Sequence, residues 1–155
     1  MNPDELKEHE RFLRRSIELA ESTMKEGNNP FGAVLVKDGE ILLEDANRIL
    51  TDCDCTSHAE INLVRQACAK FDDDLLSQTT LYASSEPCIM CTGAIYWSGI
   101  PRIVYACSST KIKSEIGDSL LIPSAEILAR GVREVEVIGP ILEQESLAVH
   151  KRKGK

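Results

Sequence analysis

The sequence predicts a single α/β domain in which helices cover both faces of a mixed sheet. Segments with apolar residues at helical spacing alternate along the chain with short apolar runs typical of strands. The 155 residues are 43% hydrophobic and 28% charged, which suits one globular domain with a sizeable core. No repeat or low-complexity linker divides the chain. We therefore expect a three-layer α/β/α sandwich that spans residues 1–155.

The first half of the chain is expected to hold a helix, a hairpin and a second helix. The first helix covers 4–26, and its apolar stripe consists of Leu6, Leu13, Ile17, Ala20 and Met24. Residues 33–36 and 41–43 are the expected strands of a hairpin, with Asp38 and Gly39 in the turn. A polar loop over 47–57 then leads to a helix over 58–70.

The second half is expected to continue the alternation. A strand over 79–83, a helix from Pro87 to about Gly99 and a strand over 103–107 form a strand–helix–strand unit, which predicts a parallel pair. The remaining expected elements are a long loop over 108–121, a short helix over 123–130, a strand over 132–137 and a last helix over 141–150.

Two thiols and one imidazole have the spacing of a metal site. Cys88 and Cys91 are three residues apart on the expected first turn of a helix, so both side chains point the same way. Pro87 suits the first helical position, and the positive helix end favours thiolates. His58 would complete three protein ligands for zinc and leave a fourth position open, as catalytic rather than structural zinc requires.

Glu60 makes this site specific for proton-transfer chemistry. Two residues after His58, it is too close in sequence for a comfortable fourth ligand but near enough to reach a water at the metal. A carboxylate in that position can take a proton and pass it on. Read alone, Glu60 would be an ordinary carboxylate at a helix start, and Cys88 with Cys91 could be a redox pair or part of a structural zinc site.

The remaining cysteines and histidines carry less information. Cys53-Asp54-Cys55 could bind a second metal, but buried or partly buried free thiols are the better interpretation of Cys53, Cys55, Cys68 and Cys107. His9 and His150 are expected on the surface of polar terminal helices, and the basic residues 151–155 as a frayed tail.

Charge and hydropathy limit the class of partner and compartment. The net charge of −7 argues against nucleic acid as the main partner. The acidic start is not a signal peptide, and no apolar run approaches the length of a membrane span, so we expect a cytoplasmic protein with reduced thiols.

The His58-Ala59-Glu60 and Pro87-Cys88-Ile89-Met90-Cys91 segments fit the H-x-E…P-C-x-x-C signature of zinc nucleobase deaminases. Over nearly its whole length the chain resembles the cytidine and deoxycytidylate deaminase superfamily, and within it the guanine deaminase, cytosine deaminase and tRNA adenosine deaminase group. Further matching segments are 30–34, Asn47 and 93–97. The resemblance implies a five-stranded mixed sheet, one catalytic Zn²⁺ per chain and a homodimer.

The resemblance also implies roles for single residues. The metal ligands would be His58, Cys88 and Cys91, and the catalytic residues Glu60 and Asp118, the latter with a second proton-handling role. The substrate-binding residues would be Asn47, Phe31, Ala59, Cys88 and Trp97.

We therefore expect a single zinc-dependent deaminase domain, a hydrolase that acts on cyclic amidine C–N bonds. Its expected substrate is a free nucleobase or nucleoside with a guanine-like or cytosine-like amino-substituted ring, from which it releases ammonia. Phe31, Trp97 and the acidic charge favour this substrate class over tRNA. Two alternatives stay open: a tRNA-specific adenosine deaminase that converts A to I at the wobble position, and a catalytically silent deaminase-like binding subunit.

Overall fold

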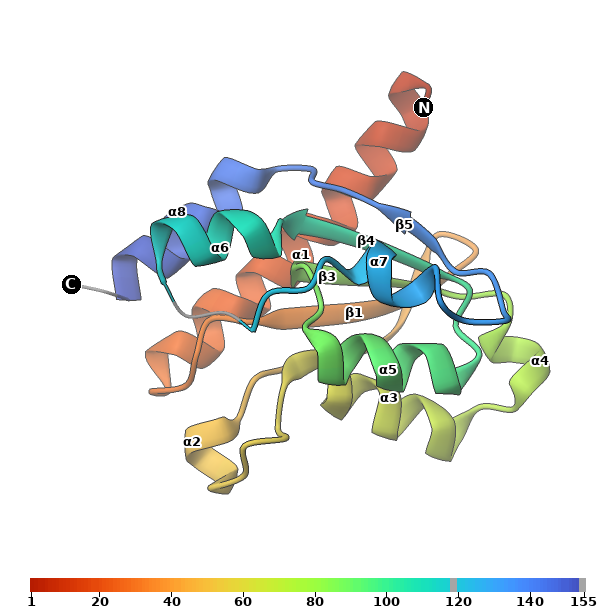
Figure 1. Ribbon diagram of the computed structural model, residues 1–155, viewed down its shortest axis with the longest axis horizontal. Coiled ribbons are helices and arrows are strands. Elements are labelled where there is room, and N and C mark those ends of the chain that lie inside the picture. The colour runs from red at the N-terminus through yellow and green to blue at the C-terminus, as the bar shows by residue number, and fades with distance from the viewer. Residues whose placement is uncertain (118–119, 154–155) are drawn as a thin grey trace.

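The computed structural model describes residues 1–117 and 120–153, and these residues form a five-stranded sheet with helices on both faces (Figure 1). The strand order is β2-β1-β3-β4-β5. The strands are β1 (Gly32–Lys37), β2 (Glu40–Ala46), β3 (Thr80–Ser85), β4 (Arg102–Cys107) and β5 (Glu136–Ile138). The sheet is mixed: β1 is antiparallel to β2 and β3, whereas β3, β4 and β5 run parallel. The predicted fold class and the parallel β3–β4 pair are confirmed.

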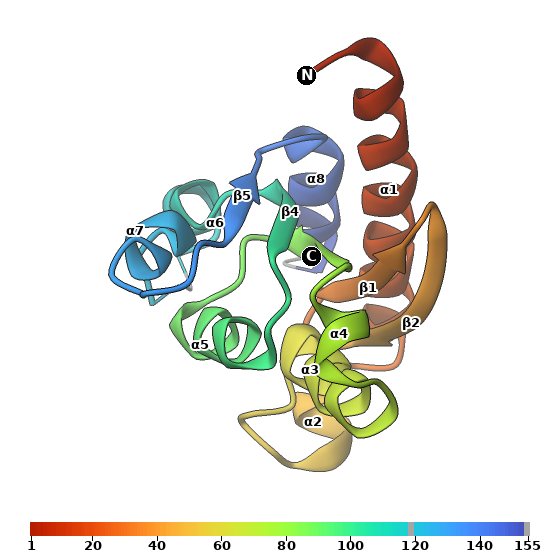
Figure 2. The same ribbon diagram turned by 90° about the vertical axis from the view of Figure 1, so that its right-hand side faces the viewer.

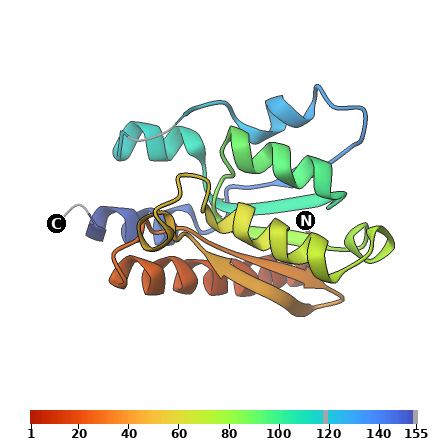
Figure 3. The same ribbon diagram turned by 90° about the horizontal axis from the view of Figure 1, so that it is seen from below.

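Two helices cover one face of the sheet and two others cover the opposite face. Figure 2 shows α1 (Pro3–Lys25) and α8 (Glu143–Lys153) on one side of the strands and α3 (Ala59–Lys70) and α5 (Ile89–Ser98) on the other. The view from below shows α3 and α5 side by side (Figure 3). Apolar side chains fill both interfaces. The core beneath α3 and α5 includes Leu63, Leu81 and Ile103, and the core beneath α1 includes Phe12 and Val34.

Close backbone contact sets the position of α1 on the sheet. A Cβ atom on Gly32 would lie 2.2 Å from the carbonyl oxygen of Ser16 and 2.9 Å from the amide nitrogen of Ala20. Only glycine therefore allows β1 to approach the helix so closely. Gly99 ends α5 in the left-handed conformation at φ +87, as its sequence position predicted.

Three short helices and several boundaries differ from the sequence-based expectation. The predicted loops and connector contain α2 (Ile49–Asp52), α4 (Asp73–Leu76) and α6 (Ser109–Glu115), and α7 spans Ser124–Leu128. Helices this short carry too little apolar periodicity to be recognised. Helix α5 begins at Ile89 with Cys88 as its N-cap, so Pro87 precedes the cap instead of occupying the first helical position.

Several predicted burial states were wrong. Leu6 is partly exposed, whereas His9 and His150 are buried because each imidazole hydrogen-bonds a hydroxyl group inside the protein. Cys53, Cys55 and Cys68 are exposed, and Cys107 alone of these four thiols is buried. Residues 151–153, expected to fray, continue α8, where charged partners hold Lys151 and Arg152. Across the described ranges, no helix is both long and apolar enough to cross a membrane.

Candidate metal and substrate site

The segments singled out from the sequence meet at one edge of the sheet. This edge carries the start of β1 and the ends of β2, β3 and β4, because β1 is antiparallel to its two neighbours. Phe31 precedes β1, Asn47 follows β2, and His58 is the N-cap of α3. Cys88 is the N-cap of α5, so two helix N-termini with their positive partial charge converge on this edge.

His58, Cys88 and Cys91 form a cluster that fits a zinc ion. Their three ligand atoms lie within 4.8 Å of one another, and His58 Nδ1 is 3.6 Å from Cys88 Sγ and 3.5 Å from Cys91 Sγ. A tetrahedral centre with Zn–S near 2.3 Å and Zn–N near 2.05 Å separates sulfur and nitrogen ligands by about 3.6 Å. These separations match that tetrahedral spacing and exceed those of strong hydrogen bonds. The donor set and spacing therefore suit zinc.

With only protein atoms around the two thiols, Cys88 is ionised and Cys91 is protonated. The hydrogen bond from Cys91 and the neighbouring His58 lower the pKa of Cys88 to about 4. The hydrogen bond to Cys88, burial and the nearby Glu60 carboxylate raise the pKa of Cys91. A divalent cation between the two sulfur atoms would allow both to ionise, since metal coordination requires thiolates. The charge distribution thus also points to a cation site.

Glu60 lies in the first turn of α3, almost fully buried beside the cluster. Burial raises the pKa of its carboxyl group to about 7, although the hydrogen bond to Cys91 acts in the opposite direction. A carboxyl group whose pKa lies near neutrality exchanges protons readily, as a general acid–base group must. Glu60 also lines the cavity next to the three ligands. Its position therefore allows proton transfer to a molecule in that cavity.

Asn47 is held so that one end of its side chain stays available. Its backbone N–H donates to the carbonyl oxygen of Phe31 at 2.9 Å, and its own carbonyl oxygen accepts from Thr23 Oγ1 at 2.6 Å. The side-chain oxygen accepts from the backbone N–H of Ile49 at 3.1 Å. These bonds orient the side-chain amide, whose Nδ2 has no partner among the described residues. Asn47 lines the cavity, so this nitrogen is a donor for a ligand there.

A cavity of about 380 Å³ opens in front of the cluster and brings most of the expected site residues together. Its walls include His58, Glu60, Cys88, Asn47 and Phe31.

Three expected residues are placed differently. Ala59 is fully buried and does not line this cavity. Trp97 lies near the end of α5 with 84% of its surface exposed, outside the cavity of its own chain. Asp118 lies outside the described residues.

Glu86, for which the sequence predicted no role, also lines the cavity. One carboxylate oxygen accepts from the backbone N–H and hydroxyl of Ser109, each at 2.9 Å. The other accepts from the backbone N–H of Ser124 at 2.8 Å and its hydroxyl at 2.7 Å. Glu86 thus caps the N-termini of α6 and α7 together. The only feature of the sequence that could have indicated this role is the position of Glu86 directly before Pro87.

A His–Cys–Cys cluster beside a glutamate that is not a ligand is the site type of the zinc-dependent deaminases that act on nucleobase rings. The family follows directly from comparison with known proteins. The chain belongs to the cytidine and deoxycytidylate deaminase family, whose zinc-binding region matches residues 6–107.

Named relatives differ in the ring they act on. The chain is 36% identical to a probable cytosine deaminase of Schizosaccharomyces pombe, over 97% of this chain and 96% of the relative. It is 45% identical to the guanine deaminase of Bacillus subtilis, over 66% of each chain. A crystal structure solved in complex with 8-azaguanine superposes with a TM-score of 0.81 at 28% identity, covering 94% of this chain and 83% of that one.

Proposed function

We propose that this protein is a zinc-dependent hydrolase that deaminates an amino-substituted nucleobase ring, as a free base or nucleoside, and releases ammonia. The observation that carries the proposal is the buried Glu60 carboxyl group beside the His58–Cys88–Cys91 cluster, at the wall of a cavity large enough for such a ring. A catalytically silent subunit would have no use for this proton carrier.

The chemistry is the exchange of a ring amine for an oxygen atom by water. When bound by His58, Cys88 and Cys91, zinc supplies Lewis-acid activation of water at neutral pH. Glu60 accepts a proton from the attacking water, delivers it to a ring nitrogen and then assists the departure of ammonia. The balance is one ring amine and one water consumed, and one ring carbonyl and one ammonia formed.

Asn47 and Phe31 would bind and orient the ring. The unpartnered Nδ2 of Asn47 donates to an acceptor on the ring edge, and the Phe31 side chain forms an apolar wall of the same cavity. Burial of Glu60 and Asn47 keeps bulk water away from these polar contacts, which strengthens them.

A tRNA substrate is the second candidate, because the chain resembles deaminases that act on the wobble adenosine of tRNA. The acidic net charge of −7 disfavours it, since binding to a polyanion depends on clustered positive charge. A polynucleotide substrate would also make activity fall steeply between roughly 50 and 200 mM salt, whereas a neutral ring would not.

Ammonia release from a substrate panel tests the proposal. The zinc-loaded protein would be assayed with free purine and pyrimidine bases, their nucleosides and a tRNA anticodon stem-loop, each at low and high salt. We expect turnover of at least one base or nucleoside with weak salt dependence. Activity confined to the stem-loop would establish the tRNA alternative, and no ammonia from any substrate would favour the silent subunit.

We also propose that the protein forms a homodimer through the surface around α5. Trp97 on α5 and Val132 in the loop that follows α7 are both large apolar residues that are highly exposed. Trp97 cannot reach the cavity of its own chain, so a substrate-binding role for it would require a second copy. A closed two-fold dimer would cover both apolar patches at once.

A further inference from the structure

A second cavity, of about 420 Å³, adjoins the cavity in front of the metal cluster. Three residues, Asn29, Phe31 and Ile112, line both cavities, so the two compartments share a wall. Small-molecule sites commonly occupy 300–1,000 Å³, and a single nucleobase ring fills only part of that range. The second compartment is therefore available to a part of the substrate other than the reacting ring.

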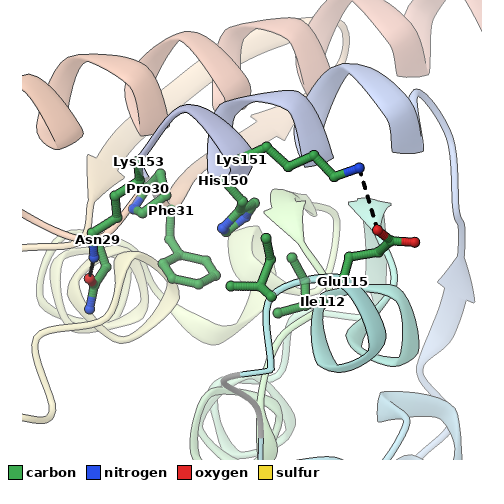
Figure 4. A pocket seen from close by; sticks show the side chains of 9 residues that line it. Asn29, Pro30, Phe31, Ile112, Glu115, His150, Lys151 and Lys153 are labelled. Carbon is green, nitrogen blue, oxygen red and sulfur yellow. Dashed lines mark hydrogen bonds and ion pairs between the residues drawn. The ribbon is translucent and has the colours of Figure 1, made fainter. Parts of the chain in front are cut away.

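His150 projects from α8 into this second compartment. Figure 4 shows its imidazole pointing from the helix into the space between Phe31 and Ile112. The ring packs edge-on against Phe31 with their centroids 5.0 Å apart. Its Nε2 lies 3.0 Å from Oγ of Ser85, a residue that lines the metal-side cavity. One hydrogen bond thus connects the two compartments.

The other imidazole nitrogen is the polar atom available to a ligand. Nδ1 of His150 has no hydrogen-bond partner among the described residues, and every fully buried side-chain nitrogen or oxygen in the same residues has one. Nδ1 is therefore not fully buried, and because His150 lines the second cavity, this nitrogen is the one available to a ligand there. Burial lowers the pKa of His150 to about 4, so the imidazole is neutral near neutral pH. Because the Ser85 hydroxyl can donate or accept, Nδ1 can accept or donate in turn, which suits a ligand hydroxyl group.

The charged groups at the rim of the compartment already have polar partners. Lys151 Nζ lies 3.4 Å from a carboxylate oxygen of Glu115, an ion pair drawn in Figure 4, and Lys153 donates to the side-chain oxygen of Asn29. The interior between them presents Phe31, Ile112 and the neutral His150. An apolar interior with one adaptable polar atom suits an uncharged, hydroxylated group.

We propose that this compartment takes the ribosyl group of a nucleoside and that His150 binds its hydroxyls through Nδ1. The proposal rests on the proposed deaminase function and narrows its substrate class from base or nucleoside to nucleoside. The reacting ring would occupy the metal-side cavity, and Phe31 would separate ring from sugar.

Paired substrates test this assignment. Values of kcat/KM for ammonia release would be measured with guanine and guanosine, cytosine and cytidine, and adenine and adenosine, and with each nucleoside 5′-monophosphate. For the ring on which the protein acts, we expect kcat/KM of the nucleoside to exceed that of the free base by about tenfold or more. A tenfold difference corresponds to about one well-placed polar contact. A free base as good as its nucleoside, or a monophosphate preferred to the nucleoside, would overturn the assignment.

The variant His150→Gln isolates the role of Nδ1, because a glutamine amide can still reach Ser85 but places no polar atom at the Nδ1 position. We expect the nucleoside-to-base ratio of kcat/KM to fall roughly three- to tenfold, mainly through KM. The matched control is His9→Gln: His9 is 6% exposed like His150 and bonds the Tyr82 hydroxyl at 2.8 Å, but it lines neither cavity. The ratio should not change in this control.

A second variant and the activity on bases distinguish failure of this inference from failure of the proposed deaminase function. If His150→Gln does not fold, Ser85→Ala provides the second variant, because it releases the imidazole and should lower the same ratio. An unchanged ratio in the folded variants would overturn the role of His150. No ammonia from any ring would refute the deaminase function itself, whereas turnover of bases but not nucleosides would refute only this inference.

Discussion

At the scale of single residues, burial sets the protonation state of Glu60 and of the two buried histidines. Desolvation raises the pKa of Glu60 to about 7, which makes it a ready proton carrier. Desolvation also lowers the pKa values of His9 and His150, with Arg102 adding to the effect at His9 and Lys153 at His150. Both imidazoles are consequently neutral hydrogen-bonding groups inside the protein.

The neutral state of His150 predicts how stability depends on pH. Its pKa is about 4 in the folded protein and near 6.5 when unfolded, so the unfolded chain binds more protons between these values. The free energy of unfolding should therefore fall as the pH drops from 6.5 towards 4, with His150 contributing about 1–3 kcal/mol.

Denaturant unfolding of the wild type and His150→Phe at pH 7 and pH 4.5 measures this contribution. The variant should lose less stability on acidification than the wild type. Both proteins have the same metal ligands, so the effect of pH on those ligands cancels in the comparison. Equal losses in the two proteins would show that His150 does not titrate as described.

At the scale of secondary structure elements, Glu86 holds the cavity wall together by capping α6 and α7. Glu86→Ala removes the acceptor for two helix N-termini and should lower the free energy of unfolding by about 2–4 kcal/mol. Glu86→Gln keeps one acceptor oxygen and should cost less. Urea titration of both variants checks the ranking, and an alanine variant as stable as the wild type would refute the capping role.

The elements also show which features the sequence could predict. The β3–α5–β4 unit and the Cys88–Cys91 pair follow from local spacing, because the residues that determine them are close together in the chain. His58, 30 positions before Cys88, was identified through Glu60 two residues after it. The burial of His150 could not be predicted in this way. It depends on Ser85, which lies 65 positions away and meets the imidazole only after α8 packs on the sheet.

Glu86 and Trp97 also show that local sequence patterns do not predict long-range packing. Glu86 has a role that the sequence did not predict, and Trp97 lacks within its own chain the position that was predicted for it. Glu86 acquires its role from Ser109 and Ser124, which belong to helices too short to be recognised from their pattern. Trp97, expected at the substrate, lies on the outside of its own chain near the C-terminal end of α5, whereas the cavity is at the N-terminal end of that helix. Long-range packing decides both positions.

At the scale of the whole molecule, the exposed apolar surface around α5 predicts self-association. Sedimentation should give a dimer at micromolar concentration, and Trp97→Glu should shift the protein to a monomer, because a charged group buried without a partner is costly. Lys113→Ala, a change at an exposed site on α6, serves as the control and should remain dimeric. A monomeric wild type would contradict the proposed interface.

The central claim is that one protein-held zinc and one proton carrier act together in a single cavity. Glu60→Gln separates these two parts, since it leaves His58, Cys88 and Cys91 unchanged but removes the group that accepts the proton. Cys91→Ala serves as the control, because it removes a metal ligand and should lose both zinc and activity.

The decisive measurement is turnover of Glu60→Gln at a zinc content determined by elemental analysis on the same sample. We predict one zinc per chain, as in the wild type, with turnover lower by about 100- to 10,000-fold. Half of the wild-type turnover at full zinc occupancy would contradict this prediction, and the proton transfer would then have to be assigned to another residue.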